Sequence, residues 1–257
     1  MNAQIFKFAS LFAMSVLSAS VFAQERPAQA KEHPLVPAIR FTETCLGRVE
    51  AFPGYEATFY KREIIGRSVV NQKMKLKIRH SPFSVYLYFQ EPSAGREVLY
   101  VEGKNNGKLI AHESGLLSLA GSMELSPTDP MALKESRYPI TEAGIAKAIR
   151  QLLVEWKRET KYGETDVKYY KDAKLGSMTC RVIESSHPQP RKQFTYHKVQ
   201  LWINDADGIP VRIRKYGFPA RAGQEAPIIE DYTFTDINTS VRLTDVDFDR
   251  NNSKYSF

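Results

Sequence analysis

Two cysteines, Cys45 and Cys180, are the residues best suited to nucleophilic chemistry in this chain. A thiol reacts as its thiolate, which a nearby cation favours, and neither cysteine has a histidine close by or a recognisable motif around it. A reactive thiol is therefore the least favoured interpretation. In an oxidising compartment the two could form one disulfide bond, and the alternative is two buried free thiols. The sequence leaves both of these open.

The five histidines are scattered along the chain. His112-Glu113 begins like the zinc-binding pattern His-Glu-x-x-His, but Leu116 stands where the second histidine is required. No nucleophile elbow, phosphate-binding loop, dinucleotide fingerprint or Cys-x-x-Cys pair occurs either. We therefore expect no catalytic residues, no metal ligands and no cofactor, and we expect that the protein is not an enzyme.

An acidic run near the end of the sequence, Asp245-Val246-Asp247-Phe248-Asp249, places carboxylates at alternate positions, as a calcium loop does. It lacks the glycine at the sixth position and the glutamate at the twelfth that such a loop requires. Because Val246 and Phe248 alternate with the carboxylates, we interpret the run as an edge strand with one solvated face.

The elements that would position any site are mostly strands. The clearest pattern runs from Lys73 to Arg79, where Met74, Leu76 and Ile78 alternate with cations. A strand puts these two sets on opposite faces, whereas a helix would spread both around its axis. Similar stretches predict further strands at 55–60, 83–89, 97–101, 108–112, 167–170, 178–184, 199–203, 211–214 and 228–235.

Two stretches have helical spacing instead, residues 38–52 and residues 141–162, the second capped by Thr141. About nine to eleven strands with two substantial helices leave more apolar sheet than the helices cover, and each Å² left wet costs about 25 cal/mol. The sheet must curl around its helices, close into a barrel or keep a cavity for something apolar. We expect an α+β fold, a curled antiparallel sheet (an incomplete β-barrel) with two main helices covering its concave face.

Between the two predicted β regions, Glu113 to Pro139 is too apolar for a plain linker and too broken for a strand. We interpret it as an irregular packed crossover or, alternatively, as a mobile flap. The apolar strand faces are candidate walls of a ligand cavity, and packing against the helices is the alternative for each of them. The candidate lining residues are Met74, Leu76, Ile78, Phe83, Val85, Leu87, Phe89, Leu201, Ile203, Val211 and Ile213.

Basic side chains share one face on two of the predicted strands. Dense positive charge on a strand needs solvent or anionic partners. These side chains therefore form either an ordinary solvent-exposed surface or a surface that makes transient contact with an anionic membrane. We expect no nucleic-acid partner, because the sequence contains no nucleic-acid recognition motif. The cations are Lys73, Lys75, Lys77 and Arg79 on one strand, and Arg212 and Arg214 on the other.

The N-terminal sequence has the layout of a cleavable secretory signal. Met1 to Ala23 contains one cation, Lys7, followed by an apolar run and small residues before the predicted cut. Gln24 follows that cut, where a lipid anchor would need a cysteine, so we expect no anchor. We predict a soluble protein exported to the periplasm.

The remainder of the chain has the composition of a folded protein. It is 42% hydrophobic and 25% charged, which excludes disordered and low-complexity classes. Residues 24–37 are polar and contain prolines, and they predict a flexible tether. No internal repeat or second linker is visible, so residues 38–257 are expected to form a single domain.

Six blocks of sequence carry a further signal: Arg79–Tyr86, Gly95–Gly103, Gly107–His112, Arg137–Thr141, Cys180–Glu184 and Asp247–Phe257. Together they resemble the signature of an exported bacterial family, the Domain of Unknown Function 1571 family, from about Tyr55 to the last residue. That family is similar in fold to the LolA/LolB lipoprotein carriers, which have an incomplete antiparallel barrel with helices over its apolar concave face. The resemblance implies this LolA/LolB-like fold and supplies no catalytic residues.

These observations predict a non-catalytic periplasmic carrier that binds a lipid or an acylated protein in an apolar cavity between sheet and helices. The alternative is an interaction or sensor module of the same fold, with a filled interior and partners on the basic face. An enzyme using an acid pair inside the cavity is the least favoured, because nothing in the sequence nominates the pair. We expect a monomer rather than an oligomer.

Overall fold

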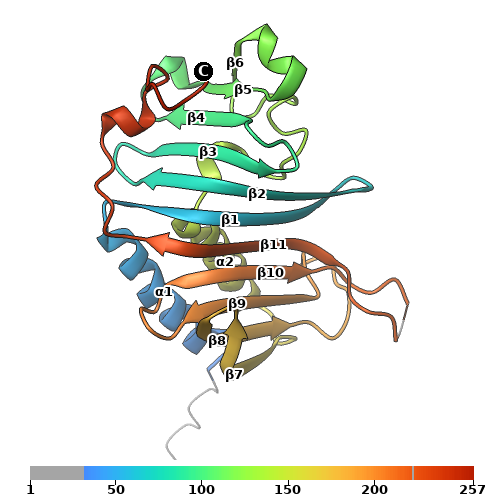
Figure 1. Cartoon of the computed structure of the whole chain (residues 1–257). Coiled ribbons are helices and arrows are strands. Elements are labelled where there is room, and N and C mark those ends of the chain that lie inside the picture. Colours follow the sequence, from blue (N-terminus) through green and yellow to red (C-terminus); the bar gives the residue numbers. More distant parts are fainter. Residues whose placement is uncertain (1–31, 222) are drawn as a thin grey trace, which may run out of the picture. The chain divides into compact units, whose positions relative to one another are not determined.

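Eleven antiparallel strands form one open sheet in the computed structural model, which describes residues 32–221 and 223–257 (Figure 1). Their order is β6-β5-β4-β3-β2-β1-β11-β10-β9-β8-β7, so the edge strands β6 and β7 do not pair with each other. The expected open antiparallel sheet with two main helices is confirmed. The strands are β1 (Gly54–Ile65), β2 (Ser68–Arg79), β3 (Ser84–Glu91), β4 (Glu97–Val101), β5 (Leu109–His112), β6 (Ser122–Leu125), β7 (Asp166–Leu175), β8 (Met178–Ser186), β9 (Lys198–Asn204), β10 (Pro210–Tyr216) and β11 (Ile228–Asn238).

The N-terminal predictions are only partly covered by the described residues. The predicted signal, Met1–Ala23, and the first part of the predicted tether lie outside them. Helix α1 begins at Leu35, so the last three residues of the predicted tether are helical. The reason is that Leu35 is fully buried, and the apolar stripe of the helix therefore starts a turn earlier than expected. Residues His33–Phe257 form one compact unit.

The pairing of β1 with β2 shows how sequence alternation sets the two faces of the sheet. In this hairpin Phe59 pairs with Met74, and Ala57 pairs with Leu76. These side chains are buried on the face that the helices cover, which we call the inner face. The basic side chains of β2 alternate with them and therefore lie on the opposite, outer face.

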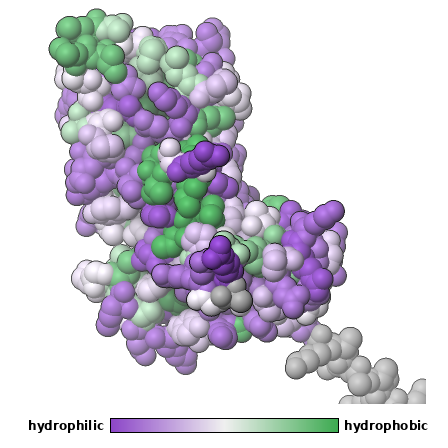
Figure 2. All heavy atoms as spheres, turned by 90° about the vertical axis from the view of Figure 1, so that its right-hand side faces the viewer, coloured by the Kyte–Doolittle hydropathy of each residue, from purple (hydrophilic) through white to green (hydrophobic). Residues whose placement is uncertain are grey.

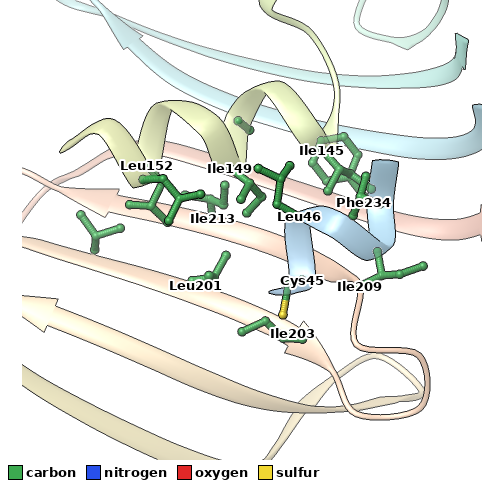
Figure 3. Packing of buried hydrophobic residues seen from close by; sticks show 14 of the residues in the cluster. Cys45, Leu46, Ile145, Ile149, Leu152, Leu201, Ile203, Ile209, Ile213 and Phe234 are labelled. Atoms are coloured by element: carbon green, nitrogen blue, oxygen red, sulfur yellow. The ribbon is translucent and has the colours of Figure 1, made fainter. Parts of the chain in front are cut away.

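Helices α1 (Leu35–Ala51) and α2 (Ile145–Glu159) cover one half of the inner face. In Figure 1 both lie behind the part of the sheet that runs from β1 to β8. Their buried stripes pack on the apolar side chains of β8 to β11, as Figure 3 shows for Ile149 and Leu152 above Leu201 and Ile213. This half of the inner face is a filled hydrophobic core.

The start of α2 is fixed by a polar contact to the sheet. The buried hydroxyl of Tyr55 accepts a hydrogen bond from the backbone N–H of Ile145 at 2.8 Å. Gly144 precedes it with φ of 97°, and a Cβ there would lie 2.9 Å from the Tyr55 oxygen, so only glycine fits. The expectation that Thr141 caps this helix is wrong, because residues 140–142 form a separate 3₁₀ turn, η3 (Ile140–Glu142).

The chain between β5 and α2, residues 113–144, covers the other half of the inner face and is called the cover here. It contains a 3₁₀ helix, η2 (Gly115–Ala120), the edge strand β6, and then irregular turns up to η3. Figure 1 shows the part between β6 and α2 passing behind β2 and β3. The cover is thus an irregular crossover that also supplies one strand to the sheet.

The acidic run of the sequence lies on the outer face as a 3₁₀ helix, η4 (Asp245–Phe248), and not as the expected edge strand. Two carboxylates of this helix pair with the basic side of β2: Asp245 with Arg79 at 2.8 Å and Asp247 with Lys77 at 3.1 Å. The Phe248 ring is buried against the outer side of β3 to β5. The run therefore holds the last segment of the chain on the sheet. A further 3₁₀ turn, η1 (Asn105–Gly107), joins β4 to β5.

Of the two alternatives left open for Cys45 and Cys180, the structure has the second: both cysteines are buried free thiols, and the disulfide is not formed. Cys45 belongs to the core beneath α1. On β8, Ile183 belongs to that same core, and Cys180 lies three residues away, so the alternation of the strand puts it on the outer face. The sheet therefore separates the two sulfur atoms. Burial raises the pKa of the Cys45 thiol, which disfavours the reactive thiolate.

Candidate functional site

A cavity of about 470 Å³ lies between the cover and the half of the inner face on which it lies. Its floor is made of apolar side chains from six strands, β1 to β5 and β11, so the strand alternation that builds the core also builds the cavity. Figure 2 shows apolar surface in the middle of one side of the molecule, surrounded by polar atoms. The apolar floor residues are Phe59, Met74, Leu87, Phe89, Val98, Leu109, Ala111 and Phe234.

The cover closes the cavity with apolar side chains of its own. Met123, Leu125, Ala132 and Ile140 line it from this side. They come from β6, from the turns that follow and from η3, and a regular helix contributes to the lining only through Ala148 and Gln151 of α2. Leu125, Ala132 and Ile140 pack on buried side chains of β4 and β5, and space remains between the cover and the rest of the floor.

The apolar character of the cavity continues onto the surface through η2. Leu116 is 88% exposed, Leu119 is 86% exposed, and Leu117 is 67% exposed while also lining the cavity. Met131, on the later part of the cover, is both exposed and part of the lining. Exposed leucines in such a group are unusual on a folded surface and commonly mark a binding region.

One end of the cavity is polar. Lys61 lies there with its ammonium group 2.8 Å from the backbone oxygen of Glu135, 3.3 Å from the Ser136 hydroxyl and 3.5 Å from the Glu63 carboxylate. Burial lowers the pKa of Lys61, against the opposing effect of Glu63. The hydroxyl of Tyr232 donates a hydrogen bond to the same Glu63 carboxylate. Lys61, Glu63 and Tyr232 thus have polar partners within the protein at this end of the cavity.

Arg96 ties the cover to the sheet at the same end. Arg96 directly precedes β4, and its guanidinium pairs with Glu113 at 2.8 Å and with Glu135 at 2.7 Å, which are both cover residues. Gln72 of β2 donates a further hydrogen bond to Glu135 at 3.0 Å. Two carboxylates thus hold the guanidinium, which raises the pKa of Arg96 although burial opposes this. We call Arg96, Gln72 and Glu135 the clamp, because they fix the later part of the cover in place.

A family model described as "Protein of unknown function (DUF1571)" matches residues 52–257. The chain belongs to the DUF1571 family. This confirms the family resemblance carried by the six sequence blocks, and the family description assigns no activity. No curated protein matches the chain.

Several solved structures resemble this DUF1571 protein. They include the lipoprotein LppX of Mycobacterium tuberculosis (11% identity, 81% of this chain, 100% of that chain, TM-score 0.46). A LolA superfamily protein of Nitrosomonas europaea is 12% identical over 81% of this chain and 97% of that chain, with a TM-score of 0.33. MucB, in the MucA/MucB complex of Pseudomonas aeruginosa, is 14% identical over 83% of this chain and 60% of that chain, with a TM-score of 0.43. Similarities of this size assign no ligand to the DUF1571 protein.

The structure distributes the eleven predicted lining residues over three environments. Met74, Leu87 and Phe89 line the cavity. Val211 is buried but does not belong to the main core. Phe83 is half-buried and packs against the main core. The other six belong to the main core and are not part of the cavity lining: Leu76, Ile78, Val85, Leu201, Ile203 and Ile213.

The strand residues of the cavity lining that the sequence analysis missed include Phe59 of β1, Val98 of β4, Leu109 and Ala111 of β5, and Phe234 of β11, and the cover residues were missed as well. On β4 and β5 these residues alternate with outer-face residues in the sequence, and this signal was available. The polar end was also visible as a pattern. Gln72 lies two residues before Met74 on β2, so it occupies the next position on the inner face, and this position is polar.

The DUF1571 protein has a second buried ionic group, beneath α2. Lys215 of β10 lies 3.3 Å from Glu230 and 3.2 Å from Glu155. Burial disfavours its charge, but the two carboxylates outweigh this and raise the pKa of Lys215. Glu230 pairs in register with Glu63 across β11 and β1. Both carboxylates already have protein partners, including Arg137 for each of them, so this acid pair offers no free group to a substrate.

The basic residues of the outer face are largely paired. Besides Lys77 and Arg79, Lys73 lies 3.9 Å from Glu91, and Arg212 and Arg214 both contact Asp231. Pairing of this kind reduces the positive potential that a membrane surface would experience. Among the described residues, no group of three or more histidine, cysteine, aspartate or glutamate side chains could hold a metal ion, and no helix is long and apolar enough to cross a membrane.

Proposed function

We propose that this protein is a non-catalytic lipid-binding carrier that holds the acyl part of a lipid or acylated protein in the cavity beneath the cover. The observation that supports this most directly is the apolar cavity of about 470 Å³ between sheet and cover. Its volume falls within the range of about 300–1,000 Å³ that is usual for small-molecule sites. The exposed leucines of η2 give an acyl chain an apolar route from the surface into the cavity.

The physical basis of binding is burial of hydrocarbon. Each methylene group moved from water into an apolar environment contributes about 0.8 kcal/mol to binding. An acyl chain therefore binds without specific hydrogen bonds or ion pairs. A cavity with an apolar floor and an apolar cover suits this kind of ligand better than a polar metabolite. The alternative interaction or sensor module requires a filled interior and an accessible basic face. The cavity and the paired cations both count against that alternative.

We place this function in the periplasm. The support is the N-terminal sequence, in which Lys7 and the following apolar run up to Ala23 have the layout of a cleavable export signal. A periplasmic carrier would shield acyl chains from water between the two membranes of the envelope.

The direct test is to isolate the protein from the periplasm of a bacterial host and to record its native mass spectrum. We expect adducts with the masses of lipids, and we expect that a fluorescent fatty-acid analogue binds at micromolar concentration to protein stripped of lipid. Absence of adducts together with no binding of the analogue would contradict the proposal.

A matched pair of variants links binding to the cavity. Ala111 lies on the cavity floor, and Ala206 is exposed in the turn between β9 and β10. Ala111→Phe fills the cavity and should weaken binding of the fluorescent analogue at least tenfold, whereas Ala206→Phe makes the same chemical change elsewhere and should leave affinity unchanged. Equal affinities of the two variants would show that the analogue binds outside the cavity.

A further inference from the structure

A second hollow lies on the outer face of the sheet, the face turned toward the viewer in Figure 1. It is an open cleft of about 520 Å³ over β2, β1, β11 and β10, with Leu175 of β7 on one side, and we call it the outer cleft. Lys61 and Gln72 line both this cleft and the cavity beneath the cover. Their side chains point to the inner face, where both contact Glu135, so the sheet separates the two spaces.

Strand register brings outer-face side chains into one row across the floor of the outer cleft. Tyr60 of β1 pairs with Lys73 of β2 and with Thr233 of β11. Thr233 in turn pairs with Arg212 of β10. Arg62 follows Tyr60 by two residues and therefore lies beside this row on the same face. Neighbouring strands are about 4.8 Å apart, so cations from three strands face one space.

Several donors in the outer cleft have no partner among the described residues. Arg62 uses Nη1 on the backbone oxygen of Ile228 at 2.6 Å, which leaves Nε and Nη2. Arg212 uses Nε and Nη2 on the two oxygens of Asp231, which leaves Nη1. None of these three free nitrogens is among the fully buried atoms that lack a partner, so each has accessible surface. The outer cleft therefore presents unused guanidinium donors.

The carboxylates of the outer cleft do not balance its cations. Asp231 is shared by Arg212 and Arg214, and the charge of Arg62 acts on the same carboxylate. Three arginines thus surround one aspartate. Glu91, the other carboxylate of the lining, lies 3.9 Å from Lys73, beyond hydrogen-bond distance, and its side chain is 73% exposed, which weakens this pair. An excess of positive charge remains in the cleft.

We propose that the outer cleft binds a phosphate group, either free or carried by the head group of a phospholipid. Unused donors from three strands can meet the oxygens of a tetrahedral phosphate from several directions, whereas a carboxylate offers two oxygens in one plane. The planar fork of arginine matches two phosphate oxygens at once. This inference goes beyond the proposed function and does not depend on it, because the site lies on the other face of the sheet.

The test is calorimetric titration of the wild-type protein with inorganic phosphate, glycerol 3-phosphate and acetate, at equal ionic strength and at a pH where phosphate is dianionic. Glycerol 3-phosphate carries the phosphate of a phospholipid without acyl chains. We expect both phosphates to bind at least about tenfold more tightly than acetate, because charge-assisted contacts reach more of their oxygens. Tighter binding of inorganic phosphate would support a site for the free anion, and tighter binding of glycerol 3-phosphate would support a site for the head group. No binding, or acetate binding as tightly as the phosphates, would overturn the inference.

A matched pair of lysine variants links binding to the outer cleft. Lys73→Met removes an ammonium group from the lining and should weaken phosphate binding about fivefold. Lys75 is the control, because it lies two residues away on the same face of β2 and does not line the cleft. Lys75→Met removes the same charge, and its effect should stay below about twofold, since salt screens the longer-range part. Equal weakening by both variants would mean that the anion senses only the general charge of this face, and would overturn the inference.

Arg62→Gln gives a second, independent result. This variant removes the two unused nitrogens of Arg62 and should weaken phosphate binding about tenfold. Affinity equal to that of the wild type would also overturn the inference. The outcomes are separable from those of the carrier experiments. A protein that binds phosphate but no fatty-acid analogue would refute the carrier and leave this site standing, and the reverse result would refute only this site.

Discussion

The two halves of the inner face are built from similar strands but are covered differently. Beneath α1 and α2, Leu201 and Ile203 are fully buried and the core is filled. Beneath the cover, Leu87 and Val98 are only half-buried and line a cavity. The comparison teaches that the cavity arises from the cover, because strand residues of the same apolar kind pack fully where a helix meets them.

The difference has a geometric cause. Apolar side chains of α2 recur at Ile145, Ile149, Leu152 and Trp156, which forms one continuous stripe that fits the spacing of the strand side chains. The cover is broken by 3₁₀ turns and by an edge strand, so its side chains reach the sheet at irregular intervals. Packing to interior density requires complementary surfaces. The helical half has them throughout, whereas the cover packs on the sheet in one small cluster around Leu109 and leaves a cavity beside it.

The largest expected effect comes from breaking the filled half. Trp156 is fully buried and its ring nitrogen donates to the Ser185 hydroxyl at 3.0 Å. We expect Trp156→Ala to lower the free energy of unfolding by about 3–5 kcal/mol, because it leaves a large cavity and an unpaired hydroxyl. Urea unfolding measures this change. Val154→Ala on the same helix is the control, since Val154 is 69% exposed and its truncation should cost less than about 0.5 kcal/mol.

Loosening the cavity half should have a smaller and more local effect. In Glu135→Ala the clamp loses its carboxylate, so Arg96 and Gln72 no longer hold the later part of the cover, while the pair of Arg96 with Glu113 remains. Because the Glu135 side chain is 43% exposed, solvent screens the pair, and we expect a loss of only about 1 kcal/mol. Hydrogen–deuterium exchange should rise in residues 126–139 and stay unchanged in α2.

The control for this loosening is Lys134→Ala, which changes the neighbouring exposed residue and leaves the clamp intact. Its exchange should match that of the wild type in both regions. Faster exchange in α2 of the Glu135 variant would mean that the two halves unfold together, which would contradict the distinction between them.

The sequence predicts the sheet well because strand alternation is a local property. The series Met74, Leu76, Ile78 identifies both the strand and its buried face, and ten of the eleven strands coincide with predicted stretches. The missed strand, β6, is a four-residue edge strand that pairs with β5 only. Its existence depends on a neighbour in space, and Gly121 and Pro127 close to its ends obscure the pattern.

The site is less predictable, because alternation gives the face of a residue but not what covers that face. Leu76 and Leu87 pair with each other across β2 and β3, yet Leu76 is in the core and Leu87 lines the cavity. The strand order and the path of the cover decide this, and both are set by long-range contacts. The start of α2 was predicted wrongly for a related reason. Gly144 precedes the first residue of this helix, at a place where the Tyr55 hydroxyl leaves no room for a side chain.

The smallest expected effect is a difference in pH dependence between the buried lysines of the two halves. Lys61 at the cavity has a pKa lowered by burial, whereas carboxylates raise the pKa of Lys215 under α2. For Lys61, the folded state releases its proton before the unfolded state does. Its contribution to stability is therefore present above the ordinary lysine value of 10.5 and is lost as the pH falls through the folded pKa.

For Lys215 the sign is opposite, because the folded state keeps its proton longer. Its contribution is present below 10.5 and is lost as the pH rises through the folded pKa. In urea unfolding from neutral to alkaline pH, the stability advantage of the wild type should therefore grow over Lys61→Met and shrink over Lys215→Met. Parallel trends for the two variants would show that both lysines occupy equivalent environments, and the electrostatic part of the comparison would then fail.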